Sequence, residues 1–253
     1  MKSILRTLKL ILTKRIAQPE KLDGMDKYSV LVTGASKGIG LAIAETLLVS
    51  GARVGLMARS FEEDLSGLVD THKDNIILIT GDVTNESDVS MAVEQICDSF
   101  GSLDVLINNA GSFSEKPVED LEGAELDRVI DTNVKSLFLT AKYAVPVMKS
   151  NKAGLIINIG SKISRNTNVA PNKTLYATSK YAVEGFSNAL RKELKPFGIR
   201  VTCLMPATVN TFISAKAGNF LSPYRVAQVV SMLIYFKDVD FENFVIKSVH
   251  QDI

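Results

Sequence analysis

Two side chains that can exchange a proton stand four residues apart in the run Tyr176–Lys180 (YATSK), near the start of a long amphipathic stretch. Residues four apart on a helix share a face, so we expect the Lys180 ammonium to lie beside the Tyr176 phenol. The pKa of a tyrosine in water is about 10, and a nearby cation favours the phenolate, which would lower that pKa toward neutrality. Ser161 follows a predicted strand upstream, where its hydroxyl can hold a carbonyl or alcohol oxygen. These residue types in this order predict general acid–base chemistry on an oxygen.

A glycine-rich turn, TGASKGIG over residues 33–40, connects an apolar run to an apolar helical stretch. A turn between a strand and a helix lets the backbone approach a pyrophosphate, and the helix N-terminus presents free N–H groups to it. The turn therefore predicts a dinucleotide site. The residues of this turn expected at the cofactor are Gly34, Ser36, Lys37, Gly38, Ile39 and Gly40.

Short apolar runs rich in β-branched residues alternate with longer amphipathic stretches from Tyr28 onward. Strands separated by helices imply right-handed crossovers and a parallel sheet with helices on both faces. We expect a single-domain, doubly wound α/β fold of the Rossmann type with about seven strands. The predicted strands are Ser29–Thr33, Arg53–Ala58, Asn75–Thr80, Val105–Asn108, Gly154–Ile159, Arg200–Met205 and Asn243–Ile246. The predicted helices are Ile39–Ser50, Glu86–Phe100, Ala124–Ser150, Leu175–Phe197 and Tyr224–Phe236.

Composition and charge argue against several classes of protein. The 253 residues include 29 basic and 28 acidic side chains, so no net field favours binding to nucleic acid. Cys97 and Cys203 lie far apart in apolar stretches, which indicates neither a disulfide framework nor a metal cluster. His72 and His250 have no partner at ligand spacing, so we expect no metal site. The sequence holds no run of about 18 apolar residues, which argues against a membrane-spanning segment.

The motifs follow one another as they do in the short-chain dehydrogenase/reductase family, which the chain resembles along nearly its whole body. TGASKGIG is similar to the family's T-G-x-x-x-G-x-G pattern, GDV at 81–83 to its acidic position beside the adenine, and NNAG at 108–111 to its N-N-A-G turn. NIGS at 158–161 and the run YATSK resemble its catalytic motifs. The resemblance implies hydride transfer between a nicotinamide and a carbonyl or alcohol carbon.

The resemblance also assigns four catalytic roles. Tyr176 would be the general acid/base, while Lys180 would bind the nicotinamide ribose and tune the tyrosine. Ser161 would orient the substrate oxygen, and Asn133, from DTNVK at 131–135, would support a water-linked proton path. The further cofactor contacts that the family motifs imply are Asp82, Val83, Asn109, Ala110, Gly111, Tyr176, Lys180, Pro206, Thr208, Val209 and Thr211.

The end of the second predicted strand bears on the choice of cofactor. It reads MARS at 57–60, without the carboxylate that NAD-specific folds offer to the ribose 2′-hydroxyl. Arg59 can instead hold a 2′-phosphate through two hydrogen bonds, and Lys37 adds a second cation from the glycine loop. These charges predict NADP(H) as the cofactor.

Three segments depart from the family pattern. Ala207 stands where the family has glycine, which puts the local backbone in question because alanine tolerates positive φ poorly. The loop over residues 162–174 is longer than usual, and its charges favour a polar or anionic substrate. Its cations are Lys162, Arg165 and Lys173. The segment Phe212–Ser222 predicts a short lid with a hinge at Ala217-Gly218, and therefore an open pocket.

Residues 1–24 form a basic segment ahead of a catalytic domain that spans residues 25–253. Residues 1–19 hold five basic side chains and no acidic one, whereas the remainder holds 24 basic and 28 acidic ones. Apolar residues recur there at helical spacing opposite the basic ones, which predicts an amphipathic helix followed by a hinge at Pro19–Lys27. Three interpretations stay open: packing on the body or on a second subunit, binding to a membrane surface, and targeting to an organelle.

These features predict an enzyme, an NADP(H)-dependent carbonyl reductase or alcohol dehydrogenase. Its substrate class stays open among 3-oxoacyl thioesters, lipids, diketones, pteridines and hydroxy acids. Two other functions stay open as well: a catalytically idle NADP(H)-binding sensor or scaffold, and a protein that acts at a membrane surface through residues 1–19. We expect a cytoplasmic homodimer or homotetramer that binds a small carbonyl or alcohol and no nucleic acid, with a membrane-associated or organellar location as the alternative.

Overall fold

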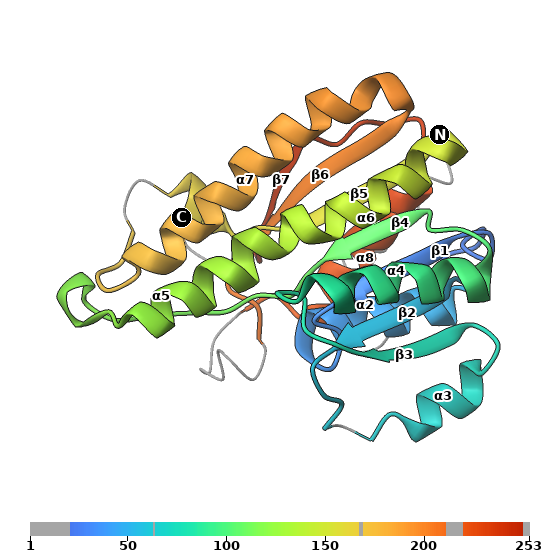
Figure 1. Cartoon of the computed structure of the whole chain (residues 1–253), viewed down its shortest axis with the longest axis horizontal. Coiled ribbons are helices and arrows are strands. Elements are labelled where there is room, and N and C mark those ends of the chain that lie inside the picture. Colours follow the sequence, from blue (N-terminus) through green and yellow to red (C-terminus); the bar gives the residue numbers. More distant parts are fainter. Residues whose placement is uncertain (1–20, 63, 167–168, 211–219, 250–253) are drawn as a thin grey trace.

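The computed structural model describes residues 21–62, 64–166, 169–210 and 220–249, which form one sheet of seven strands (Figure 1). Neighbouring strands are parallel throughout, in the order β3-β2-β1-β4-β5-β6-β7. The order reverses between β1 and β4, which is the pattern of a doubly wound sheet. The strands are β1 (Ser29–Thr33), β2 (Arg53–Ala58), β3 (Ile76–Thr80), β4 (Val105–Asn108), β5 (Gly154–Ile159), β6 (Ile199–Pro206) and β7 (Asn243–Ile246).

The inner strands are continuous apolar runs because helices cover both of their faces. β1 and β4 are buried at every residue, while the edge strands β3 and β7 are partly exposed. The strand bounds confirm the predicted strands to within one residue at each end. The fold is therefore the predicted Rossmann-type α/β sheet.

Two helical layers sandwich the sheet (Figure 1). One layer consists of α2 (Gly38–Val49), α3 (Ser66–His72) and α8 (Pro223–Tyr235), which pack into one apolar core. The other consists of α4 (Glu86–Phe100), α6 (Ser136–Asn151) and α7 (Thr174–Leu194), which pack into a second core. Among the described residues, none of the helices has the length and apolarity that crossing a membrane requires.

The predicted helix Ala124–Ser150 is wrong in its continuity. The helix α5 (Gly123–Ile130) ends before a π-helical turn at Asp131–Lys135, and α6 begins only after that turn. A π turn inserts a residue into the helical ladder with little effect on the pattern of apolar residues, so the sequence looks like one helix. The short helix α3 was not predicted, since it buries no residue fully and carries no strong apolar stripe.

The stretch that precedes β1 is attached to the body. Met25 is fully buried in the core beneath α2 and α8, and the backbone N–H of Leu22 donates to Ser50 Oγ over 2.9 Å. The hinge predicted at Pro19–Lys27 is therefore wrong for its second half. The basic segment itself, residues 1–19, lies outside the described residues.

Candidate active site

The sequence-predicted site residues gather where the strands end. The glycine turn follows β1, NNAG follows β4, Ser161 follows β5, and Pro206 ends β6. In a doubly wound sheet the carboxyl ends of the strands beside the reversal of strand order form the ligand crevice. The reversal here lies between β1 and β4, so the glycine turn and Asn109 face each other across it.

The glycine turn packs so closely against β4 that side chains are excluded at two positions. A Cβ at Gly34, whose φ is +63°, would lie 2.7 Å from Ala110 Cα. A Cβ at Gly40 would lie 2.4 Å from Gly34 O and 2.5 Å from Asn109 Nδ2. Asn109 Nδ2 also donates to Thr33 O over 3.0 Å and to Gly34 O over 2.9 Å. The predicted contact residue Asn109 thus clamps the turn to β4.

The N-terminus of α2 is prepared for an anion. Lys37 occupies the N-cap position with extended backbone and no side-chain capping bond, and the first turn of α2 contains no acidic residue. The first N–H groups of this helix therefore face outward without a side-chain acceptor, and the helix dipole adds partial positive charge. Together with the cradle at Gly34 and Gly40, these features fit the pyrophosphate of a dinucleotide.

Two cations flank this cradle with their side chains exposed. Neither the Lys37 side chain nor that of Arg59, just after β2, forms a hydrogen bond or an ion pair with any described residue. In contrast, the carboxylate of Asp82 is engaged, because its Oδ1 accepts from Thr84 N and Thr84 Oγ1, both over 2.9 Å. Two exposed cations therefore lie at the glycine turn and just after β2, with side chains that no described residue engages.

Most of the remaining predicted cofactor contacts pack against or bond to other parts of the protein. Ile39 and Val83 pack at the two apolar cores, one on each face of the sheet. Ala110 N donates to Thr33 Oγ1 over 3.1 Å. Val209 pairs with Leu221 in a short parallel bridge. Thr211 lies outside the described residues, as does the predicted lid except for residues 220–222. Of the other predicted contacts, Gly38 begins α2 and Pro206 ends β6, while Ser36, Gly111 and Thr208 lie in the segments that follow β1, β4 and β6.

Tyr176 and Lys180 both lie on α7, as predicted. Lys180 is buried, its Nζ donates to Ile159 O over 2.9 Å, and it lies 5.9 Å from the centre of the Tyr176 ring. Burial lowers the pKa of Lys180 to about 8, because the ammonium loses its hydration. The lysine can therefore titrate within the physiological range.

The prediction that the Lys180 charge lowers the pKa of Tyr176 is wrong for this structure. Burial raises the pKa of the Tyr176 phenol above its ordinary value, and a hydrogen bond with the Ser161 side chain lowers it in part. Desolvation of the phenolate is the largest effect on this pKa, and the Lys180 ammonium, which donates to the Ile159 carbonyl, does not offset it. Ser161, rather than Lys180, is the side chain that favours the phenolate here.

Asn133 is buried within the π-helical turn, and its side chain is fully used by protein atoms. Its Oδ1 accepts from Ser112 N over 2.6 Å, and its Nδ2 donates to Ser112 O and to Ser179 Oγ, both over 2.9 Å. The residue thus joins the segment after β4 to α7, beside Lys180. A Cβ at Gly111 would lie 3.6 Å from Asn133 Oδ1 and 3.9 Å from Lys180 Nζ, which brings NNAG to the same place.

Phe113 is a site residue that sequence reasoning missed. Its ring packs edge-on against Tyr176 with 4.9 Å between ring centres, and its carbonyl accepts from Arg128 Nη2 over 3.3 Å. Lys173 Nζ lies 5.8 Å from the Phe113 ring on one side and 3.5 Å from Glu115 Oε1. In the sequence, the one signal for Phe113 is its position two residues after NNAG, and that position says nothing about an aromatic contact.

The cations of the loop that follows Ser161 have different surroundings. Arg165 pairs with Glu184 at 2.5 Å and Lys173 with Glu115, whereas the Lys162 side chain pairs with no described residue. The predicted attraction for an anionic substrate therefore falls chiefly on Lys162. Ala207 is absent from the described residues with positive φ, so its replacement of glycine causes no backbone strain.

No group of three or more histidine, cysteine or acidic side chains that could hold a metal ion occurs among the described residues.

Residues 28–221 match the sequence profile of the family described as short chain dehydrogenase. An uncharacterized oxidoreductase of Staphylococcus aureus is 37% identical over 209 residues, which cover 81% of this chain and 89% of that protein.

Solved structures give the same result. A short chain dehydrogenase from Burkholderia cenocepacia in complex with NADP superposes with a TM-score of 0.79 at 26% identity, covering 87% of this chain and 96% of that one. An alcohol dehydrogenase from Thermococcus sibiricus complexed with 5-hydroxy-NADP gives 0.80 at 28% identity, covering 89% and 98%. With the profile match over most of its length, the chain belongs to the short-chain dehydrogenase family of oxidoreductases.

Proposed function

We propose that this protein transfers a hydride between NADP(H) and a carbonyl or secondary alcohol, with Tyr176 as the general acid/base. The observation that carries this proposal is the meeting of Tyr176, Ser161 and Lys180 at the carboxyl edge of the sheet, beside the cradle at Gly34 and Gly40. A proton donor, an oxygen ligand and a dinucleotide site at one crevice are what reduction of a carbonyl requires.

In the reducing direction the Tyr176 hydroxyl gives its proton to the carbonyl oxygen as that oxygen gains negative charge. The Ser161 hydroxyl, which is hydrogen-bonded to Tyr176, binds the same substrate oxygen and stabilises the developing alkoxide. The Ser161 hydrogen bond favours the phenolate that Tyr176 becomes, Lys180 would bind the nicotinamide ribose, and bulk solvent returns the proton. The nicotinamide of a dinucleotide whose pyrophosphate is held at the cradle would supply the hydride, whose electron pair forms the new C–H bond while the carbonyl π pair takes up the proton.

The raised pKa of Tyr176 suits the reducing direction, because it keeps the phenol protonated at neutral pH. A bound carbonyl oxygen accepts from the phenol and so favours its protonated form, whereas a bound alcohol donates to the phenolate and favours that form instead. In the oxidising direction Tyr176 must first lose its proton, so alcohol oxidation should rise with pH.

The preference for NADP(H) rests on Arg59 and Lys37, whose side chains are exposed and unengaged within the described part of the chain. The Burkholderia and Thermococcus relatives were both solved with NADP or a derivative of it, which supports the same choice. Residues expected at the adenine and nicotinamide ends are Asp82, Val83, Asn109, Ala110, Gly111, Pro206, Thr208, Val209 and Thr211.

Titration of the purified full-length protein with NADPH and with NADH tests the cofactor assignment. We expect tight binding of NADPH and weak binding of NADH, followed by NADPH consumption with at least one member of a panel of ketones, diketones and oxo acids. Binding of neither nucleotide would overturn the proposal. Tight binding without consumption of NADPH by any carbonyl compound, together with an intact Tyr176, would favour a sensor.

The partners of the body are a small carbonyl or alcohol and a second copy of the chain. Phe138 on α6 is 58% exposed and packs edge-on against Phe186 of α7 at 4.7 Å, which leaves an aromatic pair at the surface of these long helices. A self-complementary contact there would bury it. Light scattering of the wild type and of Phe138→Glu tests this self-association, and a wild-type monomer would contradict it.

Co-sedimentation with liposomes of the full chain and of a chain starting at Met25 decides whether residues 1–19 add a membrane contact to a cytoplasmic protein.

A further inference from the structure

Ser161 opens a 3-10 turn at Lys162–Arg165 that is tied to β6 behind it. Ser161 Oγ accepts from Ile163 N over 3.3 Å, and Ser161 O accepts from Ser164 N over 3.1 Å. Ser164 Oγ lies 3.1 Å from Ser161 O and 3.3 Å from Met205 Sδ. On the other side of Ser161, a Cβ at Gly160 would lie 3.0 Å from Met205 Cγ. The position of the Ser161 hydroxyl is thus set by the turn that follows it.

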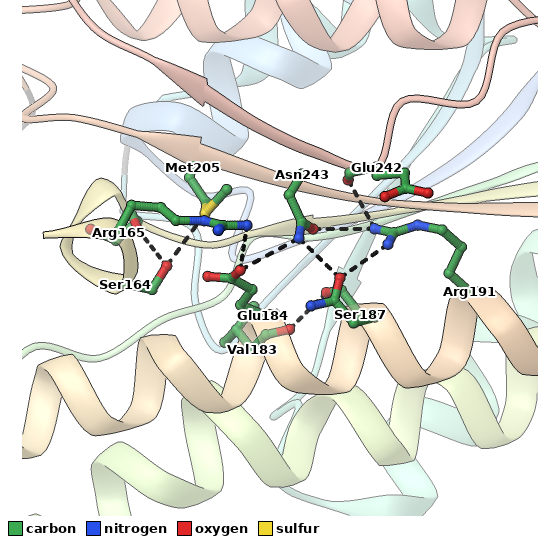
Figure 2. Close-up of polar contacts among 11 residues, drawn as sticks. Ser164, Arg165, Val183, Glu184, Ser187, Arg191, Met205, Glu242 and Asn243 are labelled. Atoms are coloured by element: carbon green, nitrogen blue, oxygen red, sulfur yellow. Dashed lines mark hydrogen bonds and ion pairs between the residues drawn. The ribbon is translucent and has the colours of Figure 1, made fainter.

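The far end of this turn is fixed to the catalytic helix. Arg165 Nη2 lies 2.5 Å from Glu184 Oε1, with the two side chains 48% and 12% exposed (Figure 2). Glu184 follows Lys180 by four residues and Tyr176 by eight, so all three side chains lie along one face of α7. One rigid helix therefore carries the phenol directly and holds the serine turn through Arg165.

A partly buried polar network keeps Glu184 in place (Figure 2). Asn243 Nδ2 of β7 donates to Glu184 Oε1 over 3.4 Å and to Asn188 Oδ1 over 2.9 Å. Arg191, only 7% exposed, donates from Nη2 to Glu242 O over 2.9 Å and to Asn243 Oδ1 over 3.2 Å, and from Nε to Val201 O over 2.7 Å. α7 is thereby joined to β6 and β7, and the Glu184 carboxylate has little freedom to turn away.

We propose that Arg165 and Glu184 are positioning residues, which fix the Ser161 hydroxyl relative to the Tyr176 phenol. The inference rests on the proposed function, because it assumes that Ser161 holds the substrate oxygen. An ion pair between two exposed side chains would have little effect, but the Glu184 carboxylate is largely shielded from solvent and also accepts from Asn243, so it restrains the chain segment that bears Arg165. A displacement of the serine hydroxyl by about 1 Å is enough to slow a reaction up to about 100-fold.

A cycle of variants tests whether Arg165 acts through Ser161. The variants are Arg165→Gln, Ser161→Ala and the double variant, with kcat measured from NADPH consumption with 2,3-butanedione as probe. We expect Arg165→Gln to lower kcat about 10-fold, with the NADPH Kd changed less than about twofold, and to have no further effect when Ser161 is already alanine. Arg165→Lys should restore part of the rate, because it keeps the charge. Lys142→Gln, which breaks the exposed pair with Glu86 between α6 and α4, is the matched control and should leave kcat unchanged.

An equal loss from Arg165→Gln in both backgrounds would overturn the inference, as would no loss in either. A fully active Ser161→Ala would instead overturn the proposed function. Hydrogen exchange gives a readout that does not depend on the probe or on activity. In Arg165→Gln and in Glu184→Gln, amides of residues 161–166 should exchange at least about 10-fold faster than in the wild type, while those of the glycine turn stay unchanged. Unchanged exchange at 161–166 in both variants would also overturn the inference.

Discussion

The two halves of the crevice are held in shape by different means. On the cofactor side the backbone of the glycine turn lies against Ala110 and is bonded by the Asn109 amide, so that Gly34 and Gly40 have no room for a Cβ. On the substrate side the Ser161 turn is held by side chains, namely Arg165, Glu184 and Asn243. A backbone cradle binds a pyrophosphate that is common to all such cofactors, whereas side-chain anchoring can change with the substrate. The substrate side is therefore the half that can be altered without loss of the fold.

The largest effect should come from the side-chain half, at Tyr176. Tyr176→Phe removes the only proposed proton donor and leaves the backbone cradle intact, so kcat should fall roughly 100- to 10,000-fold while the NADPH Kd stays within about twofold. Steady-state kinetics and a fluorescence titration measure the two quantities. Residual activity near that of the wild type would remove Tyr176 from the mechanism.

The substrate side also contains a buried charge, Lys180, which should make the stability of the protein depend on pH. Its pKa is lowered to about 8 in the folded protein but is 10.5 when unfolded, so between these values the unfolded state binds more protons and the free energy of unfolding rises with pH. From pH 7 to pH 10.5 the wild type should gain up to ~3 kcal/mol relative to Lys180→Met. Urea unfolding of both proteins without nucleotide measures this gain. A constant difference across the range would contradict the desolvated state of Lys180.

Gly40→Ala should disrupt the cofactor side of the crevice and leave the substrate side intact. The added Cβ would meet Gly34 O at 2.4 Å, which forces the turn away from Asn109 and should weaken NADPH binding by at least about 10-fold and cost ~2 kcal/mol of stability. Gly67→Ala in α3 is the control, since nothing lies within 4 Å of its added Cβ. Equal thermal shifts and equal nucleotide affinities in the two variants would show that the cradle adapts.

The smallest effect should come from Arg59, which lies on the cofactor side but acts through its side chain. Arg59→Ala should weaken NADPH binding about 10- to 30-fold, because one charge-assisted contact to the 2′-phosphate is lost, and NADH binding less than about twofold. Lys73→Ala, another exposed cation near β3, serves as control. Equal losses for both nucleotides would show that Arg59 does not read the 2′-phosphate.

The strands, the glycine turn and the Tyr176–Lys180 pair could be predicted because each depends on a local pattern of residue types. Four features could not. The π-helical turn that presents Asn133 leaves the apolar pattern nearly continuous. Phe113 reaches Tyr176 from 63 positions upstream, and Arg165 reaches Glu184 across a loop, so only the folded chain brings these pairs together. The direction of the Tyr176 pKa was mistaken because a sequence shows a neighbouring charge but not the burial that outweighs it.

The strand order also constrains how the protein reaches its native state. β1 pairs with β2, only some 20 residues downstream, and β2 with β3, but β1 meets its other neighbour β4 about 75 positions along the chain. Contacts of long sequence separation form late because closing a long loop costs entropy. During synthesis the first three strands can associate while β4 is still to emerge, and the clamp from Asn109 to Gly34 closes only after that. A chain that ends before β4 should therefore lack the clamp on the glycine turn, however well its first three strands have associated.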